Sequence, residues 1–288
     1  METIHDTRLI DGKATAASVR RATAEQSAAY RETHGRAPGL ATVLVGDDPA
    51  SEVYVRNKRR QAVEAGLVDI HRRLAATVTT DAVVATVTEL AADPAVSGIL
   101  VQLPLPLGID ASAVIDAIPW HKDVDGLTTT SAGLLSRALP GLRPCTPSGV
   151  LTLLDAYDVQ LAGADVAIIG RSELVGRPLA QMLTARDATV TTIHSRTRDR
   201  ATLTRRADVV VVAAGSPGLI GREDVRPGST VIDVGIHRVN GKLTGDTRFR
   251  ELVGHAGLLT PVPGGVGPMT IAELLRNTVA AAYLTDAG

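Results

Sequence analysis

Short runs of β-branched residues alternate with helical patterns along this chain, and this alternation is what most limits its fold. In the first half, apolar runs of strand length are each followed by a stretch with helical periodicity. The predicted strands are 40–45, 69–74 and 98–102, and the predicted helices are 51–65, 80–92 and 110–118. A strand, helix, strand order of this kind predicts an α/β fold with parallel strands.

A second α/β series follows the proline-rich segment that contains Pro140, Pro144 and Pro147. We expect helices at 148–158 and 176–186, and strands at 164–169, 188–194, 208–214, 230–234 and 257–261. A chain of 288 residues exceeds the usual size of one hydrophobic core, so two domains are expected. We assign residues 1–122 and 276–288 to the first domain and 123–275 to the second. The last amphipathic stretch, 271–284, is expected to return and pack on the first domain.

Composition excludes several classes of protein. The net charge of −1 gives no indication of a basic face that would bind nucleic acid. The sequence contains no run of 18 apolar residues, so no membrane-spanning helix is predicted. A single cysteine, Cys145, excludes an internal disulfide framework, and the polar amino terminus argues against a signal peptide, so we expect a cytoplasmic protein. The seven histidines show no zinc-like spacing, and we predict no metal.

A glycine turn after the predicted strand 164–169 is a candidate dinucleotide site. Gly170-Arg171-Ser172-Glu173-Leu174-Val175-Gly176 matches the G-x-G-x-x-G pattern imperfectly, and an ordinary strand-to-helix turn is the alternative. The next strand ends in His194-Ser195-Arg196-Thr197-Arg198, with no carboxylate before Asp199 to bind a ribose hydroxyl. Arg171, Ser195 and the two later arginines suit a 2′-phosphate, which favours NADP over NAD. A solvated basic loop is the alternative for these arginines.

Lys58 is a candidate for proton chemistry. Only four lysines occur among the thirty basic residues, and lysine, unlike arginine, can release its proton when it is buried. Tyr54 lies one helical turn before Lys58 on the same face. A solvated helix face is the usual interpretation of a run such as Lys58-Arg59-Arg60, but the scarcity of lysine, the position of Tyr54 and the short loop 46–51 before this helix favour a functional lysine. A Tyr-x-x-x-Lys pair is also typical of short-chain dehydrogenases. In those enzymes the pair follows the nucleotide-binding motif, whereas in this chain the pair precedes the motif, and this order argues against the short-chain class.

Two loops at predicted strand ends supply further candidates. Gln102 ends a buried strand and can hydrogen-bond Lys58 and hold its neutral form, or act only as a cap. The sequence Lys122-Asp123-Val124-Asp125-Gly126 offers two carboxylates, which make a poor metal site without other ligands. We therefore favour a carboxylate that binds a heterocycle rich in hydrogen-bond donors.

Several segments resemble one family, the bifunctional methylenetetrahydrofolate dehydrogenase and methenyltetrahydrofolate cyclohydrolases. The segments that carry this resemblance are LIDGK at 9–13, DPASEVYVRNK at 48–58, GILVQLPLP at 98–106, KDVDG at 122–126, PCTPSGV at 144–150, GRSELVGRP at 170–178, VIDVGI at 231–236 and PVPGGVGPMT at 261–270. They run in order through almost the whole chain. The departures are few: PWHKDVDG has one additional residue, Ser131 stands where asparagine is common, and GDTRF at 245–249 replaces a more usual GDV-like run.

The resemblance implies two α/β domains, the second a Rossmann-like NADP-binding domain, with a folate cleft between them, and a homodimer. It implies NADP-dependent oxidation of 5,10-methylenetetrahydrofolate to 5,10-methenyltetrahydrofolate, then hydrolysis to 10-formyltetrahydrofolate. By similarity, Lys58 is the general acid and base, Tyr54 positions folate and lysine, Gln102 tunes the lysine, Asp125 anchors the pterin, and Ser51 supports that site.

The resemblance also implies which residues bind the cofactor and the rest of the folate. The residues implied to line the NADP site are Gly170, Arg171, Ser172, Ser195 and Ile236, and Arg196 joins them from the phosphate argument above. Pro263, Gly264 and Gly265 belong to a turn whose backbone can approach folate closely, because glycine lacks a Cβ. Two rival functions are another NADP-dependent oxidoreductase, with Tyr54 as acid toward a carbonyl, and a non-catalytic NADPH-binding module.

Overall fold

The chain divides into two compact units in a computed structural model that describes residues 6–286. The six-stranded unit combines the segment that ends at Ala17 with Thr146–Thr270, and the three-stranded unit combines Ser18–Cys145 with the segment that begins at Ile271. Each unit is built from parallel strands and helices. The predicted fold class, two α/β domains, is confirmed.

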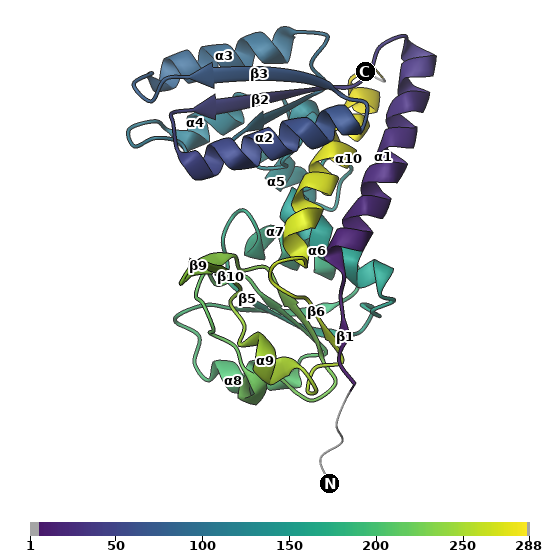
Figure 1. Cartoon of the computed structure of the whole chain (residues 1–288), viewed down its shortest axis with the longest axis vertical. Coiled ribbons are helices and arrows are strands. Elements are labelled where there is room, and N and C mark those ends of the chain that lie inside the picture. Colours follow the sequence, from purple (N-terminus) through teal and green to yellow (C-terminus); the bar gives the residue numbers. More distant parts are fainter. Residues whose placement is uncertain (1–5, 287–288) are drawn as a thin grey trace. The chain divides into compact units, whose positions relative to one another are not determined.

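The three-stranded unit is built around a parallel sheet in the order β3-β2-β4, within the described part of the chain. Its helices α2 and α3 lie on opposite faces of this sheet (Figure 1). This placement follows from the strand order, because the chain moves outward from β2 to β3 and then crosses back to β4. Its elements are β2 (Gly39–Val45), α2 (Pro49–Glu64), β3 (Val68–Leu74), α3 (Thr80–Ala92), β4 (Gly98–Val101), α4 (Ala111–Asp116), the 3₁₀ helix η1 (Trp120–Lys122) and α5 (Thr129–Ser136).

Alternate residues of β2 enter two different cores. Leu40 packs on one face with Ala62 of α2, whereas Ala41 and Val43 pack on the other with Val83 of α3. All are almost completely buried. A strand that is buried on both faces has a nearly continuous run of apolar residues, and such a run at 40–45 predicts this strand from the sequence.

The six-stranded unit contains a parallel sheet in the order β1-β11-β8-β7-β5-β6, counted over residues 6–286. A separate antiparallel hairpin, β9 and β10, follows β8. Its elements are β1 (Arg8–Leu9), α6 (Cys145–Ala156), β5 (Asp165–Ile169), α7 (Gly176–Thr184), β6 (Thr189–Ile193), α8 (Arg200–Arg206), β7 (Val209–Val212), the 3₁₀ helix η2 (Arg222–Asp224), β8 (Thr230–Asp233), β9 (His237–Val239), β10 (Lys242–Thr244), α9 (Phe249–Leu252) and β11 (Leu258–Leu259).

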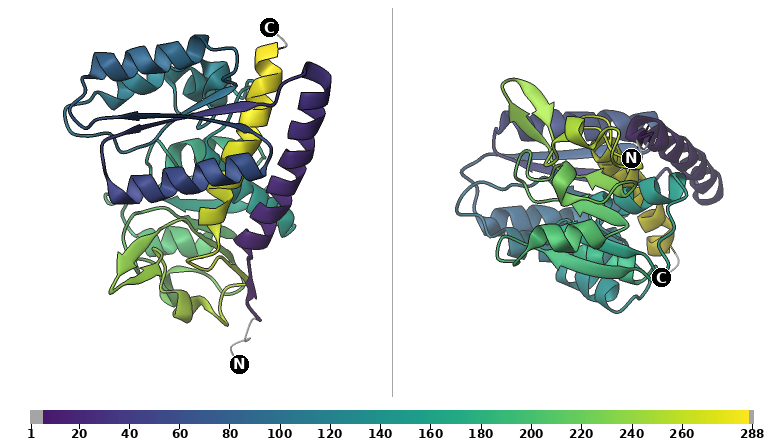
Figure 2. Two further views of the ribbon diagram at one scale, coloured as in Figure 1. Left: turned by 45° about the horizontal axis from the view of Figure 1, so that its top comes forward. Right: turned by 90° about the horizontal axis from the view of Figure 1, so that it is seen from below.

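Two long helices, α1 (Gly12–His34) and α10 (Val266–Asp286), begin in the six-stranded unit and continue in the three-stranded unit. Their carboxyl-terminal halves lie side by side (Figure 1, Figure 2). There the buried Tyr30 donates a hydrogen bond to Asp286 at 2.5 Å, and its ring packs edge-on against Tyr283 at 5.0 Å. The last helix therefore does join the first domain, as expected from the sequence.

The expected domain boundaries, 1–122 with 276–288 and 123–275, stay a prediction, and residues 1–5 and 287–288 lie outside the described range. β1 pairs in parallel with β11, with Arg8 opposite Leu258, so the amino-terminal segment belongs to the six-stranded unit. A strand of two residues leaves no periodic pattern to detect.

Helix α1 was not among the predicted helices. Its buried residues are Gly12, Ala16, Thr23, Ser27 and Tyr30, which follow helical spacing but are small or polar except for the tyrosine. Hydrophobic periodicity is therefore weak although the helix is long. None of the helices within residues 6–286 is long and apolar enough to cross a membrane.

Candidate active site

The side chains of Lys58 and Gln102 meet in the three-stranded unit. The Lys58 Nζ donates to the Gln102 Oε1 at 3.0 Å, and the Gln102 Nε2 donates to the Leu103 carbonyl at 2.6 Å. The second contact fixes the orientation of the amide, so its oxygen faces the lysine. An amide oxygen accepts an N–H from either form of lysine. Gln102 therefore orients the Lys58 nitrogen, and this contact does not by itself select the neutral form that we expected it to hold.

The start of helix α2 positions this lysine. Asp48 caps the helix by accepting the Ser51 backbone N–H at 2.8 Å, and Pro49 occupies the first turn, where its missing N–H costs nothing. The hydrogen bonds from Ser51 lower the pKa of Asp48. Ser51 is buried, whereas Tyr54 exposes 51 % of its surface. A planar ligand can therefore stack on the Tyr54 ring one turn before Lys58.

The two carboxylates of the 122–126 loop have different surroundings. Asp123 is buried and accepts the backbone N–H groups of Leu127 and Thr128 at 3.1 and 2.8 Å, so it holds the loop in shape. Burial raises the pKa of Asp125, while the nearby Lys58 lowers it. The structure therefore brings Lys58, Gln102 and Asp125 together and gives Asp123 a structural role.

Cys145 is a neighbour of Asp125 that was not predicted as a site residue. Its thiol is buried and donates to the Val124 carbonyl at 3.3 Å. Burial raises the pKa of Cys145 well above its usual range, and the Asp125 carboxylate raises it further. The thiol is therefore neutral and serves as a weak donor beside the carboxylate. Its place within PCTPSGV was the sequence signal that could have identified it.

The glycine turn after β5 has the shape of a phosphate cradle. A Cβ on Gly170 would lie 2.1 Å from the Ala213 carbonyl oxygen, and one on Gly176 would lie 2.1 Å from the Gly170 carbonyl oxygen. Only glycine fits at these two positions. Helix α7 begins at Gly176 with no side-chain cap and no acidic residue in its first turn. The Arg177 N–H already donates to the Ser172 carbonyl at 3.0 Å and Pro178 has no N–H, so the Gly176 N–H and the positive end of the helix are what suit a pyrophosphate. With the close glycine turn, the residues present fit a dinucleotide.

The candidate 2′-phosphate ligands follow two neighbouring strands. Ile169 at the end of β5 pairs with Ile193 at the end of β6, and Arg171 and Arg196 come directly after these ends. Both arginines are exposed, as is Ser195, and neither arginine forms an ion pair with another residue of the 6–286 range. Their guanidinium groups are therefore available to an anionic ligand.

A cavity of about 140 Å³ lies in the six-stranded unit between the β8 end and the 261–268 turn. Ile236, predicted for the cofactor, and Pro263, Gly264 and Gly265, predicted for folate, all line it. Lys13, which was not predicted as a site residue, also lines this cavity. Nothing in the sequence located Lys13 beside this turn. Within the described residues, no group of three or more His, Cys, Asp or Glu side chains has the geometry of a metal site.

The chain matches two family models. Residues 10–125 match "Tetrahydrofolate dehydrogenase/cyclohydrolase, catalytic domain", and residues 144–286 match "Tetrahydrofolate dehydrogenase/cyclohydrolase, NAD(P)-binding domain". A protein of Frankia alni named "Bifunctional protein FolD 2" is 62 % identical over 274 residues, which are 95 % of each chain. The "Bifunctional protein FolD" of Sphingopyxis alaskensis is 51 % identical over 287 residues, or 97 % of this chain and 95 % of that one.

Solved structures agree with these matches. The bifunctional enzyme FolD of Campylobacter jejuni superposes with a TM-score of 0.95 at 43 % identity, covering 97 % of this chain and 99 % of that one. The FolD of Trypanosoma brucei, solved with NADP cofactor and inhibitor, gives a TM-score of 0.93 at 38 % identity, covering 98 % and 99 %.

Proposed function

This chain belongs to the tetrahydrofolate dehydrogenase/cyclohydrolase family, and we propose that Lys58, Gln102 and Asp125 carry the folate chemistry of that family here. It is a bifunctional enzyme, which oxidises 5,10-methylenetetrahydrofolate to 5,10-methenyltetrahydrofolate with NADP and hydrolyses the product to 10-formyltetrahydrofolate. The observation that carries the proposal is the contact between the Lys58 Nζ and the Gln102 Oε1 at 3.0 Å, with Asp125 beside them.

In the first reaction, the protein mainly orients the two reactants. The Gly170 turn, Arg171 and Arg196 would hold NADP, which would supply the acceptor for the hydride that leaves the methylene carbon of the substrate. The folate nitrogen lone pairs stabilise the cation that forms, so no side chain has to supply a proton. The exposed ring of Tyr54 would support the substrate, since orienting the reactants is the main task of the protein in this step.

In the second reaction, Lys58 moves protons. A water molecule adds to the methenyl carbon, and the amine of Lys58 accepts one water proton as the C–O bond forms. Lys58 then delivers this proton to the folate N5 as the bond between N5 and the carbon breaks, and the second water proton leaves to solvent. Gln102 holds the nitrogen in place during both transfers, because its own amide is fixed by Leu103.

Asp125 anchors the pterin. Its carboxylate matches the N–H donors of the pterin edge, and hydrogen bonds from a ligand offset the cost of burying the charge. Burial raises the pKa of Asp125, although a hydrogen bond from the Cys145 thiol, a weak donor, lowers it. Stronger N–H donors from a ligand would therefore stabilise the carboxylate further. Ser51, buried at the start of α2, supports the same region.

The proposed site is tested by following both reactions in one ultraviolet time course with 5,10-methylenetetrahydrofolate and NADP. For Lys58→Met we expect NADPH formation to persist in part while methenyl product accumulates, because only the second reaction needs the lysine. Lys58→Arg keeps the charge but does not release its proton, so it should resemble Lys58→Met. Equal retention of both reactions in the two variants would remove Lys58 from the mechanism.

Arg60→Met is the matched control. Arg60 lies two residues further along α2 and forms an exposed ion pair with Glu64 at 2.9 Å. Such pairs contribute little to stability, so both reactions should keep their wild-type rates. If Arg60→Met also blocked the second reaction, the effect would belong to the helix and not to Lys58.

The assembly, the location and the domain boundaries are further proposals. The family resemblance supports a homodimer, which light scattering of the purified protein can test. The composition supports a cytoplasmic enzyme, and fractionation of the source cells can test that. The two rival functions, another oxidoreductase and a non-catalytic binding module, are not favoured by the family matches.

A further inference from the structure

Asp246 carries a completely buried carboxylate that is surrounded by donors. Its Oδ2 accepts the backbone N–H groups of Ala214 and Gly215 at 2.7 and 3.0 Å, and its Oδ1 accepts the Ser216 N–H at 2.8 Å. The Nε2 of His237 lies 2.7 Å from the same Oδ1. Four donors on one carboxylate offset the cost of burying its charge.

These donors lie where parallel strands end. The segment 214–216 follows β7, His237 follows β8, and Val212 of β7 pairs with Asp233 at the end of β8. The Gly170 turn touches the same place, since a Cβ there would meet the Ala213 carbonyl oxygen. Asp246 therefore ties together the loops at the carboxyl edge of the sheet, where dinucleotides bind in folds of this kind.

A second buried carboxylate, that of Asp233, holds Asp246. The Asp233 Oδ1 accepts the Asp246 N–H at 2.9 Å, and its Oδ2 accepts the Thr247 N–H at 2.8 Å and the Thr247 hydroxyl at 2.6 Å. The hydroxyl is a donor that the usual GDV-like run does not provide. A Cβ on Gly235 would lie 2.5 Å from the Asp246 carboxyl carbon, and one on Gly245 would lie 2.0 Å from Asp233. The backbone is closely packed around both carboxylates.

We propose that Asp246 is a positioning residue for the cofactor, an inference that rests on the proposed NADP site. Three successive backbone N–H groups that converge on one point form an anion-binding nest. Asp246 fills this nest from within the chain, which fixes the loop after β7. Through His237, it also fixes the residue next to Ile236, which lines the 140 Å³ cavity. Asp246 itself needs no contact with NADP.

The test uses the two reactions of the enzyme as internal comparison. Asp246→Asn keeps the size of the side chain but replaces one acceptor oxygen by an NH₂ group, which cannot accept the N–H donors it faces. We expect the KM for NADP to rise about tenfold or more, because a displacement of about 1 Å in the groups that position a ligand can cost up to roughly a hundredfold. The hydrolysis of 5,10-methenyltetrahydrofolate consumes no NADP, so its kcat and KM should stay at the wild-type values.

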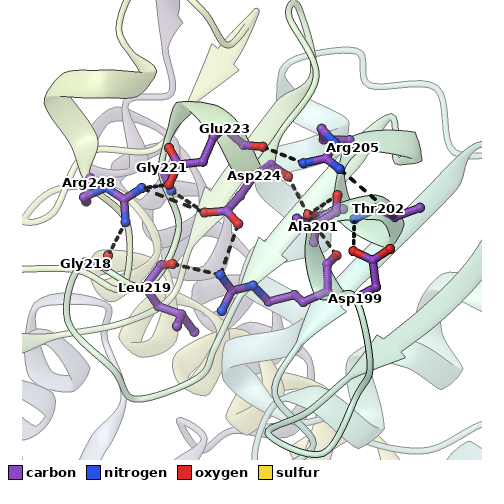
Figure 3. A network of polar contacts seen from close by, with 12 residues as sticks. Asp199, Ala201, Thr202, Arg205, Gly218, Leu219, Gly221, Glu223, Asp224 and Arg248 are labelled. Atoms are coloured by element: carbon purple, nitrogen blue, oxygen red, sulfur yellow. Dashed lines mark hydrogen bonds and ion pairs between the residues drawn. The ribbon is translucent and has the colours of Figure 1, made fainter.

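Asp224→Asn is the matched control. Asp224 lies in the crossover between β7 and β8 and is also buried, but it binds the Gly221 N–H at 3.0 Å and Arg200 at 3.1 Å, and Arg248 lies beside it (Figure 3). This control should lower the melting temperature and leave the KM for NADP unchanged. Comparing the two variants separates an effect on the position of the cofactor-binding loops, seen in the KM for NADP, from a general loss of stability, seen in the melting temperature.

A second pair of variants applies if Asp246→Asn does not fold. His237→Ala removes one of the four donors and should raise the KM for NADP severalfold, whereas His237→Gln, whose amide N–H reaches the same oxygen, should restore it. The inference is overturned if the KM for NADP stays unchanged in Asp246→Asn and His237→Ala. It is also overturned if the hydrolysis activity falls in parallel. A wild-type enzyme that did not reduce NADP would instead refute the proposed function.

Discussion

Replacing Gly12 by alanine should disturb the folate turn from a position outside it. Gly12 starts helix α1, and a Cβ there would lie 1.8 Å from the Gly265 carbonyl oxygen and 2.8 Å from that of Gly264. Its backbone φ is not in the left-handed region, so only the lack of space requires glycine at this position. An ordinary contact between carbon and oxygen is about 3.3 Å. The turn at Gly264 and Gly265 must therefore retreat by roughly 1.5 Å.

This displacement has two measurable effects. Overpacking of this kind lowers the free energy of unfolding by about 1 to 3 kcal/mol, which denaturant titration measures. A shift of about 1 Å in a residue that positions a substrate can cost up to roughly a hundredfold in rate. We therefore expect kcat/KM for folate to fall between roughly tenfold and a hundredfold. Both reactions should be affected, because both use folate, whereas Asp246→Asn affects only the reaction that uses NADP.

Gly133→Ala is the control for Gly12→Ala. Gly133 lies in helix α5, and a Cβ there has no neighbour within 4 Å. Alanine should stabilise that helix by up to about 1 kcal/mol and leave the activities unchanged. If Gly12→Ala kept the wild-type stability and the wild-type kcat/KM, the close approach of α1 to the turn would not matter, and the reasoning would be refuted.

Three further variants test the cofactor site and the two units. Arg171→Ala with Arg196→Ala should cut the preference for NADP over NAD by tenfold or more, since each charge-assisted contact contributes about 1.5 to 3 kcal/mol; an unchanged ratio of kcat/KM values would reject the 2′-phosphate assignment. Lys122→Met should lower the free energy of unfolding by roughly 2 to 4 kcal/mol. The buried Lys122 Nζ donates to the carbonyls of Ala91 and Asp93, at 2.8 and 3.1 Å, and these carbonyls lie at the end of α3. A chemical denaturation midpoint equal to that of the wild type would contradict this prediction. Burial and the hydrogen bond to Asp286 raise the pKa of Tyr30 to about 12, so the folded state keeps the proton that the unfolded state loses above pH 10. Stability should therefore fall by about 2 to 3 kcal/mol from pH 10 to pH 12, and Tyr30→Phe should remove that part of the pH dependence of thermal unfolding.

The contact between Lys58 and Gln102 could be predicted from the sequence because the two residues lie at predictable places. Gln102 ends a strand that is buried on both faces, and Lys58 lies in a helix that begins just after the neighbouring strand. Carboxyl ends of parallel strands meet at one edge of a sheet, so their proximity follows from the strand pattern. The glycine turn at Gly170 was found for the same reason.

Other features could not be found in this way. Lys122 shares the rarity of Lys58, but its partners are backbone carbonyls 29 and 31 residues earlier, which no side-chain pattern reveals. Asp246 contacts a segment 30 residues earlier after an intervening hairpin. Helix α1 shows weak hydrophobic periodicity because alanine, threonine and serine make up much of its buried face. In each case the feature depends on contacts between residues that are distant in the sequence, and a local sequence pattern does not predict such contacts.

The interleaving of the two units dictates the order in which the enzyme can be completed during synthesis. The three-stranded unit holds Lys58 and Gln102, but its core includes Leu274, Leu275 and Val279 of α10. A ribosome therefore releases strands β2 to β4 long before the helix that covers their apolar face, whereas the segment up to Thr270 already completes the six-stranded unit. The six-stranded, nucleotide-binding unit can therefore fold first, and the three-stranded unit must wait until the part of α10 from Ile271 onward has been synthesised.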